Sequence, residues 1–247
     1  MTQQPEESPS GSEIDTPGEA KYSDAPILAE DLLLVLFQPD SGAIAGESTL
    51  YYVLGGAVLA DLALNESVTT TTTRTGTLRV EAVEGRAPSD QILRGAWDYV
   101  SDKPRGVQTL LAAIGPKLRQ PLLERLVARG DIREENGKVL GLFKTTVLKD
   151  GGNGRRSGLV RDVRDVLVDG VEPTPRVAAF AALMWGSGTL HQFDRDIPWT
   201  SAVITRAQEL GAGNWGAEGA TQAVARATAA LISITAATAV PRNKGHG

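Results

Sequence analysis

The chain has 247 residues, of which 41% are hydrophobic, so it is long and apolar enough to bury a sizeable core. It contains no cysteine and only two histidines, which excludes disulfides, thiolate chemistry and a histidine-based metal cluster. A net charge of −5 argues against a general nucleic-acid binder. The N-terminus lacks the pattern of a secretory signal, and every apolar run is shorter than the ~20 residues of a membrane span. We therefore expect a protein that is soluble or attached to a membrane surface.

The first 25 residues are rich in Pro, Gly, Ser and acidic side chains and contain almost nothing apolar. Such a segment cannot offset the entropy cost of its own ordering, so residues 1–25 are predicted to be a disordered acidic tail. The fold is expected to begin at Pro26, with a short helix from Ile27. Residues 38–46 are rich in turn formers and indicate a loop.

Residues 50–64, LYYVLGGAVLADLAL, are apolar around most of the circumference of a helix and carry one charged residue, Asp61. A helix of this kind must be buried on most sides, so we predict that it forms the centre of the fold. Gly55 and Gly56 would each cost about 1 kcal/mol relative to Ala, and we expect another helix to approach closely there. If Asp61 is buried, its pKa will be raised.

Local patterns predict a hairpin and three helices after the central helix. Residues 68–83 are rich in β-branched side chains, which is typical of a small hairpin. The segment SDQILRGAWDYVSD is amphipathic and predicts a helix. Two further helices are predicted over residues 107–114 and 118–129, and Gly130 is well placed to cap the second.

The dipeptide Asn136-Gly137 is a strong signal for a two-residue turn. A second hairpin is therefore predicted from Ile132 to Phe143. Its tip and return strand would carry the apolar residues Val139, Leu140, Leu142 and Phe143.

The rest of the chain reads as a glycine-rich loop followed by helices. The loop covers residues 151–158, and a flexible tail is expected over residues 241–247. The sequence therefore predicts a mainly α protein, with a single globular helical domain over residues 26–240, built around the central buried helix and bearing small β-hairpins. The later helices are predicted over residues 159–168, 173–186, 196–210 and 217–239.

Charge is distributed unevenly along the chain. Residues 117–165 contain 12 Lys and Arg against 7 Asp and Glu, a local charge of +5 that leaves −10 for the rest of the chain. A basic region on an acidic protein is a candidate contact for an anionic partner. The alternative is a solvated helix face that forms its own ion pairs, and the composition leaves both open.

Several sequence blocks resemble the Golgi phosphoprotein 3 family in the same order. They are LAEDLLLVLF, GGAVLADLALNESV, LRQPLLERLVARGDI and LGLFKTT, and the resemblance runs from Ile27 to about Leu231. It implies a mainly helical domain with a four-helix core and a protruding hydrophobic β-hairpin. Eukaryotic members bind phosphatidylinositol 4-phosphate on membranes and act as adaptors that retain glycosyltransferases through vesicle coats. The excess of Arg over Lys, with abundant Ala and Gly, favours a bacterial member.

The resemblance implies a lipid pocket formed by several arginines and one tryptophan. Arg119 falls on one of these arginines, but the others would fall near Pro116 and at Leu54 or Gly55, and the loop 42–46 holds no tryptophan. Other arginines, Arg125, Arg155 and Arg156, could compensate for a different anionic headgroup, because guanidinium groups bind phosphate by charge-assisted hydrogen bonds. The expected lipid-headgroup residues are therefore Arg119, Arg155 and Arg156.

The second hairpin is the better match to the family's membrane element. The resemblance implies that Val139, Leu140 and Leu142 insert into a membrane and that the hairpin also contacts a second protomer, giving a homo-oligomer. Lys138 and Lys144 flank the tip and suit anionic lipid. The alternative, that these apolar residues pack on the parent domain, remains open.

Three other functional classes are alternatives to membrane binding. His191 with Asp194 and Asp196 could be read as catalytic, but neighbours on a loop are not a spatial triad, so we expect no enzyme, cofactor or metal. The helix and Asn-Gly hairpin suggest a winged-helix nucleic-acid binder, which Glu134 and Glu135 oppose. A protein-protein scaffold that has lost the lipid pocket is the main alternative. We expect a peripheral module on the cytoplasmic face of a membrane that binds an anionic, phosphoinositide-like phospholipid.

Overall fold

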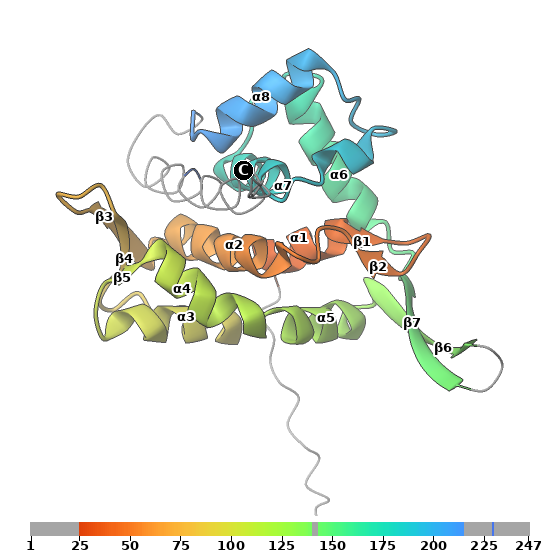
Figure 1. Ribbon diagram of the computed structural model, residues 1–247, viewed down its shortest axis with the longest axis horizontal. Helices are drawn as coiled ribbons and strands as arrows, with labels where there is room; N and C mark the ends of the chain where they lie inside the picture. Colours follow the sequence, from red (N-terminus) through yellow and green to blue (C-terminus); the bar gives the residue numbers. More distant parts are fainter. Residues whose placement is uncertain (1–24, 140–142, 215–228, 230–247) are drawn as a thin grey trace, which may run out of the picture.

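The computed structural model describes residues 25–139, 143–214 and 229, and this part of the chain is mainly α-helical with small antiparallel strand pairs (Figure 1). The helices are α1 (Leu28–Leu36), α2 (Leu50–Leu64), α3 (Gln91–Ser101), α4 (Val107–Ile114), η1 (Gly115–Lys117), α5 (Arg119–Ala128), α6 (Arg155–Leu167), α7 (Pro175–Gly186), η2 (Leu190–Phe193) and α8 (Ser201–Gly211). The strands are β1 (Phe37–Gln38), β2 (Ala43–Ile44), β3 (Val68–Thr72), β4 (Leu78–Ala82), β5 (Arg105–Gly106), β6 (Ile132–Val139) and β7 (Phe143–Asp150).

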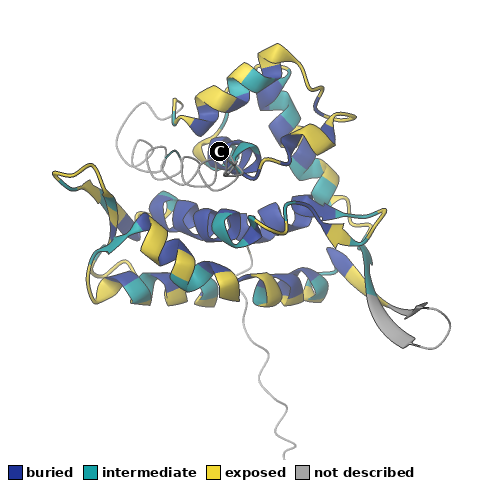
Figure 2. Cartoon of the chain, viewed as in Figure 1, coloured by how far each residue is buried: buried dark blue, intermediate teal, exposed yellow. Residues whose placement is uncertain are grey.

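The helices form three layers. Helices α1 and α2 lie in the middle, α3, α4 and α5 lie beneath them, and α6, α7 and α8 lie above (Figure 1). Figure 2 shows that the middle layer is the most completely buried part of the chain. Helix α2 packs against α1, α3, α4, α5 and α7, which confirms the prediction of a central buried helix. The expected count of four core helices stays a prediction.

The glycines of α2 and η1 permit the close helix packing that the sequence predicted. A Cβ atom on Gly55 would lie 2.9 Å from Leu111 Cδ2 on α4, and one on Gly115 would lie 2.4 Å from the Tyr51 carbonyl oxygen. Real Cβ atoms do not approach other atoms this closely. A larger residue at position 115 would therefore push η1 away from the α2 backbone, whereas one at position 55 would displace the end of the Leu111 side chain. Gly55 weakens the interior of α2, and the close packing of α4 against it explains why a glycine is found there.

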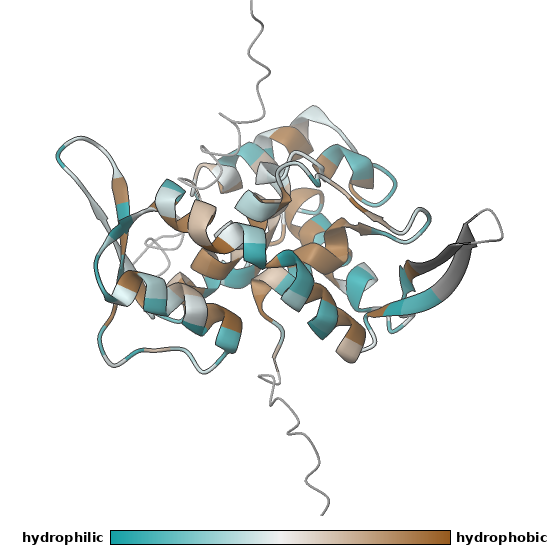
Figure 3. Cartoon of the chain, turned by 60° about the horizontal axis from the view of Figure 1, so that its bottom comes forward, coloured by the Kyte–Doolittle hydropathy of each residue, from teal (hydrophilic) through white to brown (hydrophobic). Residues whose placement is uncertain are grey.

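In the described part of the chain, hydrophobic residues are concentrated on the central helices and hydrophilic residues predominate toward the edge of the body (Figure 3). Two hairpins project from opposite ends of this body, β3–β4 at one end and β6–β7 at the other (Figures 1 and 3). The first agrees with the predicted hairpin over residues 68–83, and β5 joins it as a third strand. Within the described part of the chain, no helix is both long and apolar enough to cross a bilayer.

The predicted turn at Asn136-Gly137 is wrong. In the ladder Asn136 pairs with Thr146 and Gly137 pairs with Thr145, so both residues lie inside β6 and the strands extend as far as Val139 and Phe143. Leu140 and Leu142 lie outside the described residues. So do the predicted helix over residues 217–239, apart from Ala229, and the two predicted tails, apart from Ala25.

The base of the hairpin sets this register. Ile132 is buried and pairs with Asp150, and the Gly151 N–H donates to the Asp131 carbonyl oxygen at 2.8 Å. A Cβ on Gly151 would lie 1.7 Å from the Gly130 carbonyl oxygen, so the two backbones approach as only glycine allows. A tertiary contact therefore overrides the local turn signal, because it fixes which residues face each other across the ladder.

Two helices begin at residues other than those predicted, because of the groups that cap them. Helix α6 begins at Arg155, four positions before the prediction, because Gly154 turns the chain with φ of 78° and Asn153 Oδ1 accepts the Arg155 N–H at 3.0 Å. Helix α8 begins at Ser201, later than predicted, where the Thr200 side chain caps it. No sequence pattern predicted η2.

Buried ion pairs connect the layers. Glu30 on α1 is fully buried, and Arg125 Nη1 on α5 lies 3.2 Å from Glu30 Oε1 and 2.6 Å from Asp90 Oδ2. Burial opposes the charge on Arg125, but its hydrogen bonds to Asp90 and Glu30 outweigh that cost and raise its pKa. The buried acids are Glu30, Asp31, Asp61, Asp90 and Asp131, and their arginine partners are Arg125, Arg129, Arg155 and Arg176.

Asp61, in the last turn of α2, links three helices. Its Oδ2 accepts the first N–H of α1, from Leu28, at 2.5 Å, and its Oδ1 lies 3.0 Å from Arg176 Nη1 on α7. Burial raises the pKa of Asp61 to about 7, although Arg176 and the Leu28 N–H both lower it. The elevated pKa expected for a buried acid in this helix is confirmed.

Replacing Asp61 with Asn should change how stability depends on pH. The folded-state pKa of Asp61 lies above its ordinary value of 3.8, so its carboxyl stabilises the fold most at low pH, and this contribution is lost as the pH rises toward about 7. The unfolding free energy of Asp61→Asn, relative to the parent, should therefore rise by about 1.4 kcal/mol per pH unit between about pH 5 and 7 and level off above. Urea unfolding across this range measures it, and a constant difference would contradict the assignment.

Removing Arg125 should be costly. An Arg125→Ala variant leaves Glu30 and Asp90 buried without this partner, and we expect a loss of roughly 3 to 5 kcal/mol in unfolding free energy. The matched control is Arg94→Ala, which breaks the half-exposed pair with Asp98 and should cost less than about 1 kcal/mol. Equal effects in denaturant unfolding would show that burial does not determine the cost.

Candidate functional site

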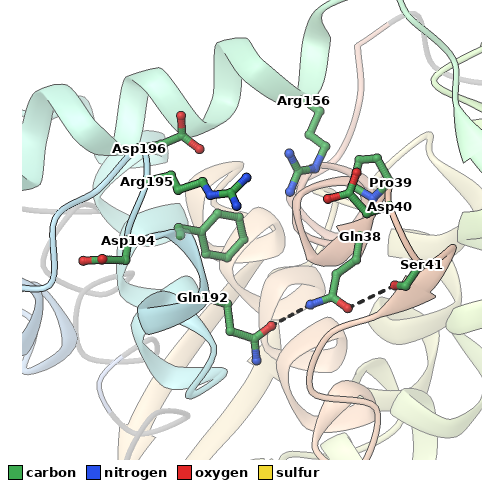
Figure 4. Close-up of a pocket in the computed structure, with 10 residues that line it drawn as sticks. Gln38, Pro39, Asp40, Ser41, Arg156, Gln192, Asp194, Arg195 and Asp196 are labelled. Carbon is green, nitrogen blue, oxygen red and sulfur yellow. Dashed lines mark hydrogen bonds between the residues drawn. The ribbon is translucent and has the colours of Figure 1, made fainter.

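A cavity of about 770 Å³ opens where the β1–β2 loop faces the first turn of α6 and the segment around η2 (Figure 4). Its lining is polar and charged apart from two residues. The lining residues are Gln38, Pro39, Asp40, Ser41, Arg156, Gln192, Phe193, Asp194, Arg195 and Asp196.

Amide hydrogen bonds join two walls of the cavity. Gln38 Nε2, at the end of β1, donates to Gln192 Oε1 on η2 at 2.7 Å. Ser41 Oγ donates to Gln38 Oε1 at 3.3 Å, and both bonds are drawn in Figure 4. The β1–β2 loop and η2 lie more than 150 residues apart in the sequence, and this bond joins them at the cavity.

Arg156 is the half-buried cation of the cavity. Its Nε donates to the Phe37 carbonyl at 3.1 Å and its Nη2 donates to the Val35 carbonyl at 3.3 Å, which satisfies acceptors at the end of α1. Its Cζ lies 5.8 Å from the centre of the Phe193 ring. Burial lowers the pKa of Arg156, while the nearby carboxylates oppose this shift, Asp150 most strongly and then Asp196 and Asp40. An arginine remains charged at neutral pH, so the cavity has a fixed positive group on one wall.

Arg195 is a second cation, on the opposite wall of the cavity. Figure 4 shows Arg195 extending toward Arg156, with Asp40 and Asp196 beside the two guanidinium groups and Asp194 turned away. Asp194 Oδ1 instead accepts the Trp199 N–H at 2.6 Å. Among the described residues no ion pair within 4.0 Å is formed by Arg195, Asp40 or Asp196.

The structure does not bring the three expected headgroup arginines to one site. Arg119 lies at the start of α5, where its Nε is 3.1 Å from Glu47 Oε1. Arg155 forms ion pairs with Asp31 and Asp131. Only Arg156 lines the cavity. Arg195 was not predicted as a site residue, and Asp196 was considered only for catalysis. Asp196 was also expected in a helix that begins at Ser201 instead.

The residues considered for catalysis do not form a triad. His191 makes an edge-on ring contact with Trp199, at 6.0 Å between centroids, and in the described residues it has no hydrogen bond to Asp194 or Asp196. No group of three His, Asp or Glu side chains within the described ranges could hold a metal ion.

The expected membrane residues belong to the β6–β7 hairpin. The backbone of Val139 pairs with that of Phe143 at the outer end of the ladder, and residues 140–142 connect them. The hairpin projects away from the helical body (Figure 1), as the family resemblance implied.

Comparison with known proteins identifies the family. The family model for Golgi phosphoprotein 3 (GPP34) matches residues 28–227, which is most of the chain. No curated protein matches the sequence. The matched region covers α1 through α8, including the central helix and the projecting hairpin. The chain therefore belongs to the Golgi phosphoprotein 3 (GPP34) family.

Proposed function

We propose that this protein is a non-catalytic, peripheral membrane-binding module that attaches to the cytoplasmic face of a membrane containing anionic, phosphoinositide-like phospholipid. Membership of the Golgi phosphoprotein 3 family supports the proposal. The single observation that carries it is the geometry of the β6–β7 hairpin.

The hairpin is anchored at one end and carries an apolar sequence at the other. Ile132 at its base is buried in the body, and the pair Val139–Phe143 lies seven residues further along the ladder. At ~3.3 Å per residue this pair is roughly 23 Å from the base. The sequence between and including these residues is VLGLF, which contains no polar side chain. An apolar segment at that distance contributes little to the helical core, but burial of each large residue in a bilayer would contribute about 1.5 to 3 kcal/mol.

Lysines beside this segment would add electrostatic attraction. Lys138 and Lys144 are paired in the ladder next to Val139 and Phe143. Each lysine near an anionic membrane surface is worth about 1 kcal/mol, and salt screens this contribution. Apolar insertion and charge together would give reversible membrane binding.

One observation favours a second candidate, a protein-protein scaffold of the same fold that has lost the lipid pocket. Each expected headgroup arginine already has a partner within the protein: Glu47 for Arg119, Asp31 and Asp131 for Arg155, and two backbone carbonyls for Arg156. In that case the hairpin would bind a second copy of the chain and form a homo-oligomer.

A charge at the hairpin tip should abolish membrane binding. We expect Leu140→Asp to bind vesicles of mixed neutral and anionic phospholipid at least about tenfold more weakly than the parent, because burying one leucine is worth more than 1.4 kcal/mol. Co-sedimentation with vesicles at low and high salt measures this. The control is Thr71→Asp, which places the same charge at an exposed position on the other hairpin and should leave binding unchanged.

Two results would decide between the candidates. If the parent protein does not bind any anionic vesicle, the membrane proposal is wrong. Dimers that form in solution and are lost in Leu140→Asp, measured by analytical ultracentrifugation, would then support the scaffold.

A further inference from the structure

The cavity holds positive and negative groups in separate positions. Arg156 and Arg195 extend toward each other from opposite walls, and the carboxylates of Asp40 and Asp196 lie beside them (Figure 4). Three of these groups, the exposed side chains of Arg195, Asp40 and Asp196, have no ion-pair partner within 4.0 Å in the described part of the chain. A ligand that carries both signs of charge would complement them.

The two arginines suit a phosphate group. Arg156 uses two of its five N–H groups on the Phe37 and Val35 carbonyls, so three remain for a ligand. Its orientation is fixed by those bonds and by the Phe193 ring, which reduces the entropy lost on binding. Arg195 can supply a second guanidinium fork, and planar forks recognise phosphate oxygens through paired hydrogen bonds.

The carboxylates suit an ammonium group and oppose a polyanion. Figure 4 shows Asp40 beside Arg156 and Asp196 beside Arg195, so these carboxylates would repel additional negative charge placed at the guanidinium groups. A phosphate that carries its own cation removes this repulsion, because the ammonium can donate hydrogen bonds to the carboxylates.

We propose that the cavity binds a zwitterionic aminophosphate of the phosphoethanolamine class, with its phosphate between Arg156 and Arg195 and its ammonium at one of the two flanking carboxylates, Asp40 beside Arg156 or Asp196 beside Arg195. The volume of about 770 Å³ accommodates such a group with its attached glycerol. The same chemistry occurs in the headgroup of phosphatidylethanolamine and in free phosphoethanolamine. As a lipid site, it rests on the proposed membrane function and adds a headgroup contact to the hairpin.

Calorimetric titration with soluble O-phosphoethanolamine, inorganic phosphate and ethanolamine tests the chemistry without a membrane. We expect phosphoethanolamine to bind at least about tenfold more tightly than either fragment, since only it forms charge-assisted bonds to both sets of groups. Arg195→Ala should weaken its binding about tenfold or more. The control is Arg161→Ala, which removes an exposed arginine from the same helix as Arg156 but outside the cavity.

A double variant, Asp40→Asn with Asp196→Asn, separates the aminophosphate from a simple anion. Both residues are exposed, so the variant should fold. It should weaken phosphoethanolamine binding and leave phosphate binding unchanged or tighter. The proposal is overturned if phosphate binds as tightly as phosphoethanolamine in the parent, or if the double variant binds phosphoethanolamine more tightly.

Vesicles distinguish the lipid from the soluble source. If phosphatidylethanolamine vesicles bind the parent more tightly than phosphatidylcholine vesicles, and Arg195→Ala removes this preference, the ligand is the lipid headgroup. Binding of phosphoethanolamine without binding to any vesicle supports the cavity ligand in its soluble form and refutes the membrane function. Vesicle binding that Leu140→Asp removes, without any response to phosphoethanolamine, refutes the cavity ligand and leaves the membrane function standing.

Discussion

Helix α1 is fixed by buried ion pairs, and the arrangement of the other layers depends on them. Its first N–H is taken by Asp61 of α2 rather than by a local capping residue. Glu30 pairs with Arg125 of α5, and Asp31 pairs with Arg155 of α6 and Arg176 of α7. An unpaired buried charge costs several kcal/mol, so each of these helices is held in one position relative to α1. The apolar residues supply the driving force for burial, and the charges select the packing.

The same ion pairs position the cavity. Arg155 and Arg156 are consecutive in the first turn of α6, and consecutive side chains on a helix point about 100° apart. Because Arg155 turns inward to Asp31 and Asp131, Arg156 is directed to the end of α1 and to the cavity. In the sequence, Arg155 and Arg156 look like a single contact for an anion. In the structure, Arg155 is a structural cation and Arg156 lines the cavity.

The hairpin and the cavity offer two different kinds of contact. The hairpin is attached at Ile132 and Gly151 and carries the apolar sequence VLGLF at its outer end. The cavity is polar and contains charges of both signs. Insertion of an apolar tip is insensitive to the identity of the headgroup, whereas paired charges discriminate between headgroups. In the proposed function the first would give affinity for a membrane and the second would give selectivity.

The sequence alone determined the elements whose signals are local. The apolar run of residues 50–64 predicted α2 with its observed bounds, and β-branched residues predicted the β3–β4 hairpin, because side-chain periodicity and propensity act within a few residues. Tertiary structure decided the register of β6–β7, through the Asp131–Gly151 contact, and the separation of Arg119, Arg155 and Arg156. It also brought Gln38 beside Gln192. These outcomes depend on contacts between residues far apart in the chain. A local sequence pattern does not specify which distant residue a charged side chain pairs with, or which strand register forms.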